Sequence, residues 1–337
     1  MKAGFLDKLN SEIVLRDYEL PDPGDNEVTI EQKYTGVCFR DILTQEGFFP
    51  RVSLPIIPGH EIGGTIIKKG RNVRGFSIGD KVSSLIYIPC GKCEFCLSGN
   101  ENLCPNKIAY GEGINGGYSK YVNASERSLV KVPEGVPDEI IPIAACVIAM
   151  LYHAIARVGK IKKGDHVLIT GAGGGVGVHA VQMVKALGGH PIAETSSKWK
   201  EEELYKLGAE YIVSPDREYN KDVKDITGQG ADIVLEDVGI ATFSKSLRSL
   251  KTGGRLVVIG NLKPEPVELP LGLIILKGIS IKGSISSTKE DLKKALELSK
   301  SLILPVIGGK IQLSDINKGY KDMLDRNVFG RLLIQYK

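Results

Sequence analysis

Four of the six cysteines fall in one short loop at a spacing that suits a metal ion. They form the pattern Cys90-x-x-Cys93-x-x-Cys96-x7-Cys104 in a segment rich in glycine, asparagine and proline. Thiolates separated by two residues can converge on one cation, and four of them satisfy the tetrahedral preference of zinc. We therefore predict a closed structural zinc site over residues 90–104, with two disulfides or an iron–sulfur cluster as the alternatives.

The two remaining cysteines have different neighbours. Cys38 stands three residues before Asp41, the motif Gly59-His60-Glu61 follows, and Cys146 lies in an apolar segment. Taken singly, a buried cysteine is usually a small hydrophobic residue, and a lone histidine more often makes a structural hydrogen bond than binds metal. Their meaning therefore depends on the rest of the chain.

A glycine-rich turn follows a predicted strand. The strand ends at Thr170, and an amphipathic helical pattern runs from the turn to Leu187. Glycines let the backbone approach a pyrophosphate, whose charge then lies at the N-terminus of the helix. The spacing is Gly-x-x-Gly-x-x-Gly rather than the strict G-x-G-x-x-G, so the motif alone is weak evidence. The predicted dinucleotide contacts are Gly171, Gly174, Gly175, Val176 and Gly177.

Alternating strands and helices surround this turn. Such alternation, with six strands, is typical of a doubly wound nucleotide-binding sheet, the Rossmann architecture. The fold class is therefore α/β with a six-stranded parallel sheet. The predicted strands are 166–170, 190–195, 210–214, 231–236, 255–260 and 279–284.

The end of the second strand bears on the cofactor. An acid at this tip would bind the ribose 2′-hydroxyl and disfavour a 2′-phosphate. Here Thr195 is followed by Ser196 and Lys198, which are donors and a cation suited to a phosphate. We therefore expect NADP(H) to be preferred over NAD(H). A one-residue shift of register would instead place Glu194 at the tip and favour NAD(H).

The composition is that of an ordinary globular protein. The chain has 337 residues, 42% of them hydrophobic and 25% charged, with 44 basic and 40 acidic side chains. This excludes a disordered, fibrous or small disulfide-stapled protein. The net charge of +4 gives no case for nucleic acid or membrane as a partner. No signal peptide is apparent, and the apolar segment 140–152 is too short to span a membrane, so we expect a cytoplasmic protein.

The whole chain resembles the zinc-containing alcohol dehydrogenase superfamily, the medium-chain dehydrogenases/reductases. The resemblance rests on Gly59-His60-Glu61, the four-cysteine lobe, residues 146–152, the nucleotide turn and Gly253-Gly254-Arg255. It implies a GroES-like, β-rich catalytic domain built from residues 1–150 and 286–337. It also implies an NAD(P)-binding Rossmann domain over residues 151–285, and a small-molecule substrate.

The resemblance further implies a second, catalytic zinc, giving two zinc ions per chain. Cys38, His60 and Cys146 would be its ligands, and Glu61 the carboxylate that can approach the metal. Asp41 would orient His60, and Gly260 would belong to the cofactor site.

Arg40 departs from the pattern of this superfamily. Alcohol dehydrogenases usually carry Ser or Thr at this position, where the hydroxyl relays the alcohol proton. A guanidinium stays protonated at neutral pH and cannot do so, but it can bind an anionic or carbonyl-bearing substrate. The segment around Arg40, residues 47–51 and the tail after Leu271 are similar to the crenarchaeal acryloyl-CoA reductases.

Three activities are therefore compared. The first is NADPH-dependent reduction of the C=C bond of a short enoyl thioester, which the missing relay hydroxyl favours. The second is zinc-dependent alcohol oxidation, with Thr35 or Tyr152 as a substitute hydroxyl. The third is a non-catalytic nucleotide-binding protein, against which the intact Cys38, His60 and Cys146 argue.

Two predictions concern the C-terminal third of the chain. A surface helix is expected over 288–300, beginning with a capping box formed by Ser287 and Glu290. The apolar run 271–276 is either core or part of an interface, because in this superfamily the following strand often pairs across a two-fold axis. We accordingly expect a homodimer or homotetramer.

Overall fold

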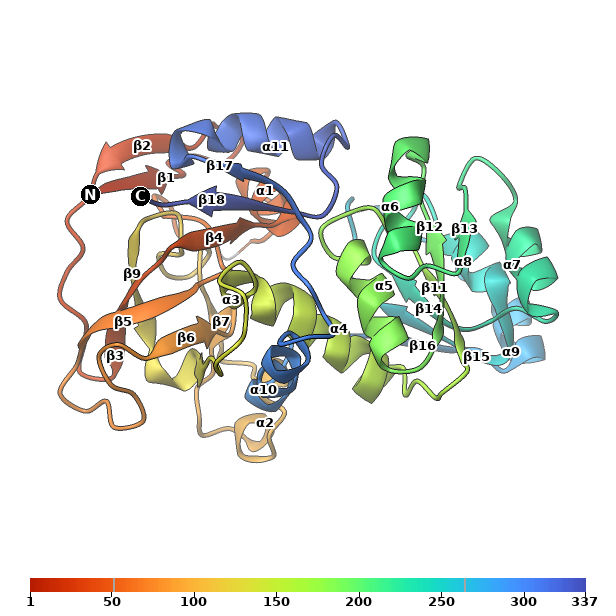
Figure 1. Cartoon of the computed structure of the whole chain (residues 1–337), viewed down its shortest axis with the longest axis horizontal. Coiled ribbons are helices and arrows are strands. Elements are labelled where there is room, and N and C mark those ends of the chain that lie inside the picture. Colours follow the sequence, from red (N-terminus) through yellow and green to blue (C-terminus); the bar gives the residue numbers. More distant parts are fainter. Residues whose placement is uncertain (51, 264) are drawn as a thin grey trace. The chain divides into compact units, whose positions relative to one another are not determined.

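The computed structural model describes residues 1–50, 52–263 and 265–337 (Figure 1). The chain forms two compact units. One contains Met1–Met150 together with Ser286–Lys337, and the other contains Leu151–Ile285. Arg51, the last residue of the segment 47–51 used in the sequence comparison, lies outside the described residues.

The second unit is built on six parallel strands in the order β13-β12-β11-β14-β15-β16. Numbered along the chain, this order is 3-2-1-4-5-6, which is that of a Rossmann sheet. The predicted doubly wound sheet and all six predicted strands are confirmed, although β15 begins five residues early. The strands are β11 (His166–Ile169), β12 (His190–Glu194), β13 (Tyr211–Val213), β14 (Ala231–Glu236), β15 (Leu250–Val258) and β16 (Ser280–Gly283).

Helices alternate with these strands. Helix α5 (Gly177–Ala186) follows the glycine turn and buries Val178, Val181 and Val184. These three positions repeat at the helical period, so the predicted apolar face is confirmed. Leu187 caps the helix and is only half-buried. The other helices are η5 (Lys198–Lys200), α6 (Glu201–Lys206), α7 (Tyr219–Thr227), α8 (Phe243–Ser249) and α9 (Leu271–Lys277).

Helix α9 packs on the core of its unit with only part of its apolar surface. Leu271 is 66% exposed, Ile275 76% and Leu276 86%. The core interpretation of residues 271–276 therefore holds only in part, because Leu271, Ile275 and Leu276 lie on the surface of the chain. Only the partly buried Leu273 and Ile274 pack onto the core.

The first unit is β-rich, as expected for a GroES-like domain. Its main sheet is antiparallel, in the order β10-β6-β5-β3-β9. These strands are β3 (Glu27–Glu31), β5 (Gly63–Lys69), β6 (Lys81–Ser84), β9 (Tyr121–Ser125) and β10 (Leu129–Lys131). Two strand pairs flank it: β1 (Lys2–Phe5) with β2 (Val14–Asp17), and β7 (Tyr87–Ile88) with β8 (Ile108–Ala109).

A smaller sheet joins the two ends of the chain. It has the order β17-β18-β4, with β4 (Tyr34–Val37), β17 (Ile307–Ile311) and β18 (Arg331–Gln335). Strands β4 and β18 are antiparallel, and Val37 stands opposite Leu332. This register brings Cys38 and Arg331, the residues next to that pair, to the same end of the sheet.

Short helices complete the first unit. They are α1 (Phe39–Gln45), α2 (Glu94–Leu97), η1 (Glu101–Leu103), η2 (Glu126–Ser128), α10 (Lys289–Leu298), η6 (Leu313–Asp315) and α11 (Ile316–Leu324). The predicted helix at 288–300 is α10, but its capping box is formed by Thr288 and Asp291. The assignment to Ser287 and Glu290 was wrong by one residue, because the Ser287 hydroxyl donates instead to the carbonyl of Ala145 at 3.2 Å.

One helical segment runs over residues 140–158. It comprises α3 (Ile140–Ile143), the π-helical turn η3 (Ala144–Ala149), α4 (Met150–Tyr152) and the π-helical turn η4 (His153–Val158). It is longer than the apolar segment 140–152 noted in the sequence, because the helix continues past that segment. Among the described residues it is the one helix whose length and composition suit a membrane span, yet 72% of its most apolar window is buried in the protein, as in a core helix.

Candidate active site and metal centres

Cys38 lies at the N-terminus of helix α1, immediately after strand β4. Its sulfur accepts a hydrogen bond from the Arg40 amide at 3.4 Å, and its own amide donates to the Asp41 carboxylate at 2.9 Å. This reciprocal arrangement is a capping box with cysteine in the place of the usual serine or threonine. The local sequence Cys-Phe-Arg-Asp therefore fixes the sulfur and the carboxylate relative to each other.

Asp41 also holds His60. The Nδ1–H of His60 donates to Asp41 Oδ1 at 2.9 Å, and both side chains are almost completely buried. Asp41 Oδ2 accepts a second bond from the Tyr118 hydroxyl at 2.9 Å, and Tyr320 in turn donates to Tyr118 at 3.1 Å. A carboxylate behind an imidazole fixes its tautomer and leaves Nε2 free to bind a metal. The orienting role expected of Asp41 thus has a geometric basis, and its two tyrosine partners were missed from the sequence.

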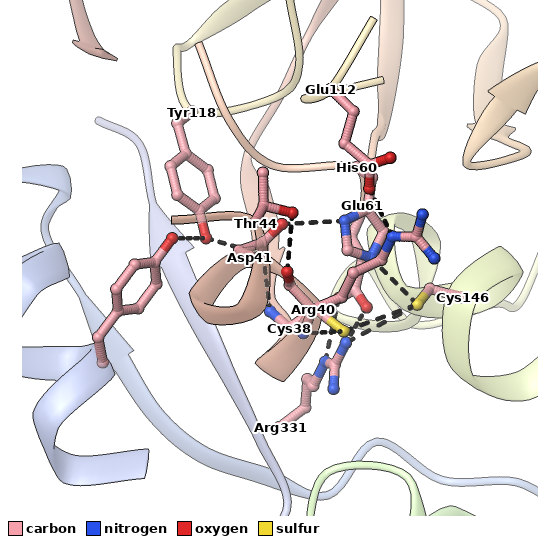
Figure 2. Close-up of polar contacts among 11 residues, drawn as sticks. Cys38, Arg40, Asp41, Thr44, His60, Glu61, Glu112, Tyr118, Cys146 and Arg331 are labelled. Atoms are coloured by element: carbon pink, nitrogen blue, oxygen red, sulfur yellow. Dashed lines mark hydrogen bonds and ion pairs between the residues drawn. The ribbon is translucent and has the colours of Figure 1, made fainter. Parts of the chain in front are cut away.

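Figure 2 shows the side chains that meet in front of this carboxylate. Nε2 of His60 lies 3.3 Å from Cys146 Sγ, and the sulfurs of Cys38 and Cys146 are 4.0 Å apart. Cys146 comes from the π-helical turn η3, a local widening of the helix that often occurs at functional sites. The ligand atoms of Cys38, His60, Glu61 and Cys146 all lie within 4.8 Å of one another. Two thiols and an imidazole at this spacing fit the donor set of a catalytic zinc site.

The charges of this cluster are strongly coupled. The hydrogen bond with Cys146, opposed by burial and assisted by Arg331 and His60, lowers the pKa of Cys38 well below its ordinary value. The same bond and burial raise the pKa of Cys146 well above its ordinary value. Burial opposes a charged His60, but Asp41 and the Cys38 thiolate outweigh it and raise the pKa of His60. Cations compete for such sites by displacing protons from these groups.

Glu61 is paired with a residue that the sequence did not single out. Arg331, at the start of β18, donates to both carboxylate oxygens, from Nε at 3.1 Å and from Nη2 by a second contact. The Arg331 side chain is 4% exposed, and Glu61 is completely buried. Gly36 makes room for the pair, because a Cβ there would lie 1.6 Å from Glu61 Oε2. The available signal was an arginine at the start of a strand whose next three residues are apolar.

Arg40 is also paired. Its Nε donates to Glu112 Oε1 at 2.6 Å, and its guanidinium carbon lies 4.2 Å from the centre of the Phe49 ring. The guanidinium is close enough to interact with the charges of both Cys146 and Cys38. The predicted substrate-binding arginine therefore lies at the cluster, but it has a carboxylate partner that no sequence motif indicated.

The four-cysteine lobe forms a second cluster, in the first unit. All six cysteines of the chain are free thiols, so the disulfide alternative is wrong in this structure. The sulfur of Cys96 lies 3.5 Å from that of Cys93 and 3.9 Å from that of Cys90. All four sulfurs, that of Cys104 included, lie within 4.8 Å of one another, which fits a tetrahedral metal ion.

The glycine turn lies in the second unit, between β11 and α5. Gly171 adopts a φ of +61°, and its amide donates to the Glu194 carboxylate at 2.8 Å. Val176 caps α5, and a Cβ on Gly177 would lie 2.5 Å from the Gly171 carbonyl oxygen. Glycine at 177 is thus required for the close approach of helix and turn. Gly174 donates its amide to the Gly171 carbonyl at 2.9 Å, and the Gly175 carbonyl accepts from His179.

The end of β12 leads the chain back to this turn. Glu194 is the last residue of the strand and is 3% exposed, and the Thr195 hydroxyl accepts from the Ser197 amide at 3.2 Å. Ser196 and Lys198 are exposed. Lys200 is buried and donates to the Gly173 carbonyl at 3.2 Å, so it packs against the turn. Gly260 lies close to Asp237, because a Cβ there would be 2.0 Å from Asp237 Oδ1.

Together the two units define a class of protein. The chain combines a dinucleotide-binding unit with a unit that carries a thiol–imidazole cluster, as zinc-dependent dehydrogenases do. Two family models agree: the alcohol dehydrogenase GroES-like domain matches residues 24–134, and the zinc-binding dehydrogenase model matches residues 175–301. The chain belongs to the zinc-containing alcohol dehydrogenase superfamily and is an oxidoreductase that acts on a small molecule, so the resemblance drawn from the sequence is confirmed. The family supports zinc and a nicotinamide cofactor.

Individual relatives are more specific. The chain is 43% identical to the acryloyl-coenzyme A reductase of Sulfurisphaera tokodaii over 94% of this chain and 95% of that protein. It is 38% identical to the acryloyl-coenzyme A reductase of Metallosphaera sedula over 95% of both. A crystal structure of an NAD-dependent alcohol dehydrogenase superposes with a TM-score of 0.93 at 29% identity, over the full length of both chains.

Proposed function

We propose that this chain reduces the C=C bond of a short enoyl-CoA thioester with NADPH. Two of its relatives are named acryloyl-coenzyme A reductase. The observation that carries the proposal is the 43% identity to one of them over more than nine-tenths of both chains. The second relative, at 38%, extends the similarity to another organism.

The surroundings of Arg40 support this choice. Alcohol oxidation needs a group that takes up the alcohol proton, and Arg40 occupies the position of the usual relay hydroxyl. Thr35, one substitute considered, is completely buried and donates its hydroxyl to the Gly117 carbonyl at 2.9 Å. Reduction of an enoyl thioester releases no alcohol proton, so it needs no relay at this position.

The reaction balances as the addition of a hydride to the β-carbon and a proton to the α-carbon. NADPH supplies the hydride and becomes NADP⁺, and water supplies the proton. Zinc held by Cys38, His60 and Cys146 would supply a Lewis acid able to polarise the thioester carbonyl. The Arg40 guanidinium is placed to donate a hydrogen bond to a carbonyl at the cluster, and charge-assisted bonds of this kind are the strong ones.

For the metals, we propose two zinc ions per chain. Cys38, His60 and Cys146 hold the catalytic ion, with Glu61 within reach. The guanidinium of Arg331 pairs with Glu61 and opposes the rise in the Glu61 pKa that burial causes. The structural ion is held by Cys90, Cys93, Cys96 and Cys104. Zinc is favoured over an iron–sulfur cluster because one closed tetrahedral cation needs no further ligand.

For the cofactor, we propose that NADP(H) is preferred over NAD(H). Glu194 and Thr195 are both buried, but the carboxylate of Glu194 is engaged by the Gly171 amide of the glycine turn, which supports Thr195 rather than Glu194 as the residue at the ribose. The exposed Ser196 and Lys198 then offer a donor and a cation to a 2′-phosphate.

The assembly is also a proposal. The apolar exposed face of α9 stands next in the chain to β16, the edge strand of its sheet, and such an edge favours pairing with a second copy. We therefore propose a homodimer or homotetramer in the cytoplasm, with residues 1–150 and 286–337 as the catalytic domain and residues 151–285 as the cofactor domain. A monomer by light scattering at micromolar concentration would contradict the assembly.

The deciding experiment compares two reactions of the purified enzyme. NADPH oxidation is followed with acryloyl-CoA and longer enoyl-CoA thioesters, and NAD(P)⁺ reduction with simple alcohols. The second candidate is a zinc-dependent alcohol dehydrogenase, which the similarity to the NAD-dependent alcohol dehydrogenase favours. Turnover of alcohols without any reduction of enoyl thioesters would select it.

A further inference from the structure

Glu112 is the partner of Arg40, and its position is built into the fold. Gly111 has a φ of +74°, and a Cβ on it would lie 2.9 Å from the Gly59 amide nitrogen. A Cβ on Gly116 would lie 1.9 Å from the Gly59 carbonyl oxygen. The loop that carries Glu112 therefore packs with its backbone directly on the residue before His60. The loop is therefore fixed relative to the cluster of Cys38, His60 and Cys146 before any substrate binds.

The loop on the other side of Arg40 is tied to the same residue. The Ser53 amide donates to the Glu112 carbonyl at 2.9 Å, and the Phe49 ring covers the guanidinium of Arg40. The Glu112 side chain is 12% exposed and that of Arg40 36%. The carboxylate is thus the more enclosed member of the pair, and it holds an arginine that still reaches solvent.

The hydrogen bond to Glu112 uses only one edge of the guanidinium. Its donor is Nε, and within residues 1–50, 52–263 and 265–337 the two terminal Nη groups of Arg40 make no hydrogen bond. Figure 2 shows the guanidinium beside His60 and Cys146, with the Glu112 carboxylate adjoining it. The terminal N–H groups therefore remain available for a ligand at the cluster.

A count of charge shows why Glu112 matters. A divalent cation held by two thiolates is neutral, and Glu61 is neutralised by Arg331. Of the remaining charges, Arg40 and Glu112 form the pair whose guanidinium reaches the cluster, whereas Asp41 is buried behind His60 and Lys107 is close enough to Arg40 to interact with its charge. Alone, a guanidinium pairs readily with a carboxylate, often through two parallel hydrogen bonds. With Glu112 2.6 Å from Nε, an incoming carboxylate meets a like charge, whereas an uncharged carbonyl does not.

We propose that Glu112 is a specificity-determining residue: it neutralises Arg40 and directs its terminal N–H groups to the cluster, so that the site accepts the uncharged carbonyl of an acyl thioester and rejects the free acid of the same acyl chain. The proposal rests on the proposed enoyl-thioester reduction. It deepens that function, since the substrate and product thioesters carry the same short chains as acrylate and propionate, the acids formed by their hydrolysis. A repulsive element is one way to discriminate against such an acid.

The test is the affinity for a free acid, measured without turnover. Isothermal titration calorimetry with propionate is carried out on the zinc-loaded enzyme and on Glu112→Gln, which keeps an acceptor for Nε but removes the charge. Propionate should bind roughly tenfold more tightly to Glu112→Gln, since loss of one nearby like charge is worth about a factor of ten. Glu46→Gln, at the exposed C-terminus of α1, is the matched control and should bind propionate as the wild type does.

Two further variants separate the charge effect from a structural one. The gain should vanish in Arg40→Gln/Glu112→Gln, because the acid binds through Arg40. Glu112→Asp keeps the charge, so propionate binding should stay weak, while KM for acryloyl-CoA should rise because the shorter side chain holds Arg40 less well. A propionate affinity unchanged in Glu112→Gln, or a gain that persists without Arg40, would overturn the proposal. Absence of enoyl reduction in the wild type would instead refute the proposed function.

Discussion

Arg331 lies against Glu61 with both side chains withdrawn from solvent, beside the Cys146 thiol 3.9 Å away. The two residues are separated by 270 positions in the chain. They meet because β18 pairs with β4, whose last residue precedes Cys38. Burial raises the pKa of Glu61 above its ordinary value, and Arg331 opposes this rise. The ion pair therefore adds no net charge to the site and acts as one neutral unit beside the two thiols.

Removal of one partner should be much worse than removal of both. Arg331→Met leaves a buried carboxylate without its counter-charge and should lower the free energy of unfolding by about 3–5 kcal/mol. Glu61→Gln/Arg331→Met should recover a large part of that loss, because no buried charge is left alone. Urea unfolding of the three proteins measures this. A double variant no more stable than Arg331→Met would contradict the neutral-unit interpretation.

Behind His60, the hydroxyl of Tyr118 should contribute to metal affinity. Tyr118→Phe removes one of the three donors to Asp41, and loss of a group behind a metal ligand typically weakens metal binding 10–100-fold. We expect about tenfold faster zinc release to a chelator, at the low end of that range, because Tyr118 acts on the metal only through Asp41 and His60. Tyr320→Phe leaves all three donors in place and serves as the control. Equal release rates in both variants would exclude a special role of Tyr118.

Local patterns made much of this site predictable, and distant pairings did not. The Cys-x-x-Cys steps, the glycine turn and the six strands each depend on residues close in sequence, where spacing alone fixes geometry. Glu112, Tyr118 and Arg331 carry no such spacing signal, since they reach the site through loop packing and strand pairing. The capping residue Thr288 shows the same limit at short range. Ser287 is an equally good cap by type, and only its contact with Ala145 decides between them.

Cys93→Ser should remove the structural ion and leave the catalytic one. Elemental analysis should fall from two zinc ions per chain to one, because a closed four-thiolate site does not survive the loss of a ligand. The lobe over residues 90–104 then loses the metal ion that crosslinks it, and we expect Tm to fall by roughly 5 °C or more. Ser98→Ala, in the same lobe, is the control. A wild-type content of no more than one zinc ion would refute the two-site proposal.

The cofactor preference should depend on Lys198. Lys198→Ala should raise KM for NADPH by about tenfold and change KM for NADH little, since only NADPH carries the 2′-phosphate and a charged hydrogen bond is worth about 1.5–3 kcal/mol. Lys206→Ala removes a similarly exposed lysine that pairs with Glu202 and Glu203, and should leave both values unchanged. An equal or higher kcat/KM with NADH in the wild type would mean that Glu194 rather than Thr195 contacts the ribose.

Arg40 should separate the two candidate reactions. Arg40→Ala removes the charged donor at the cluster and should lower kcat/KM for acryloyl-CoA by about one to two powers of ten, as expected for one charged hydrogen bond. It also leaves Glu112 without its counter-charge. The informative control is Arg40→Lys, which keeps the positive charge but loses the planar donor geometry of the guanidinium. It should retain more activity than Arg40→Ala and less than the wild type.

Arg40→Ser tests the same residue in the opposite direction. It restores the hydroxyl that alcohol dehydrogenases carry two residues after the first cysteine of the cluster, and should therefore raise the rate of alcohol oxidation while enoyl reduction falls. In Arg40→Ser the Glu112 carboxylate has lost its cation and is left unpaired beside the cluster, which is unfavourable. The double variant Arg40→Ser/Glu112→Gln removes that charge and should therefore oxidise alcohols faster than Arg40→Ser. Alcohol oxidation and NADPH-dependent acryloyl-CoA reduction are measured side by side. If Arg40→Ser keeps full enoyl reduction, the guanidinium takes no part in substrate binding, and the choice between the two reactions must rest on other residues.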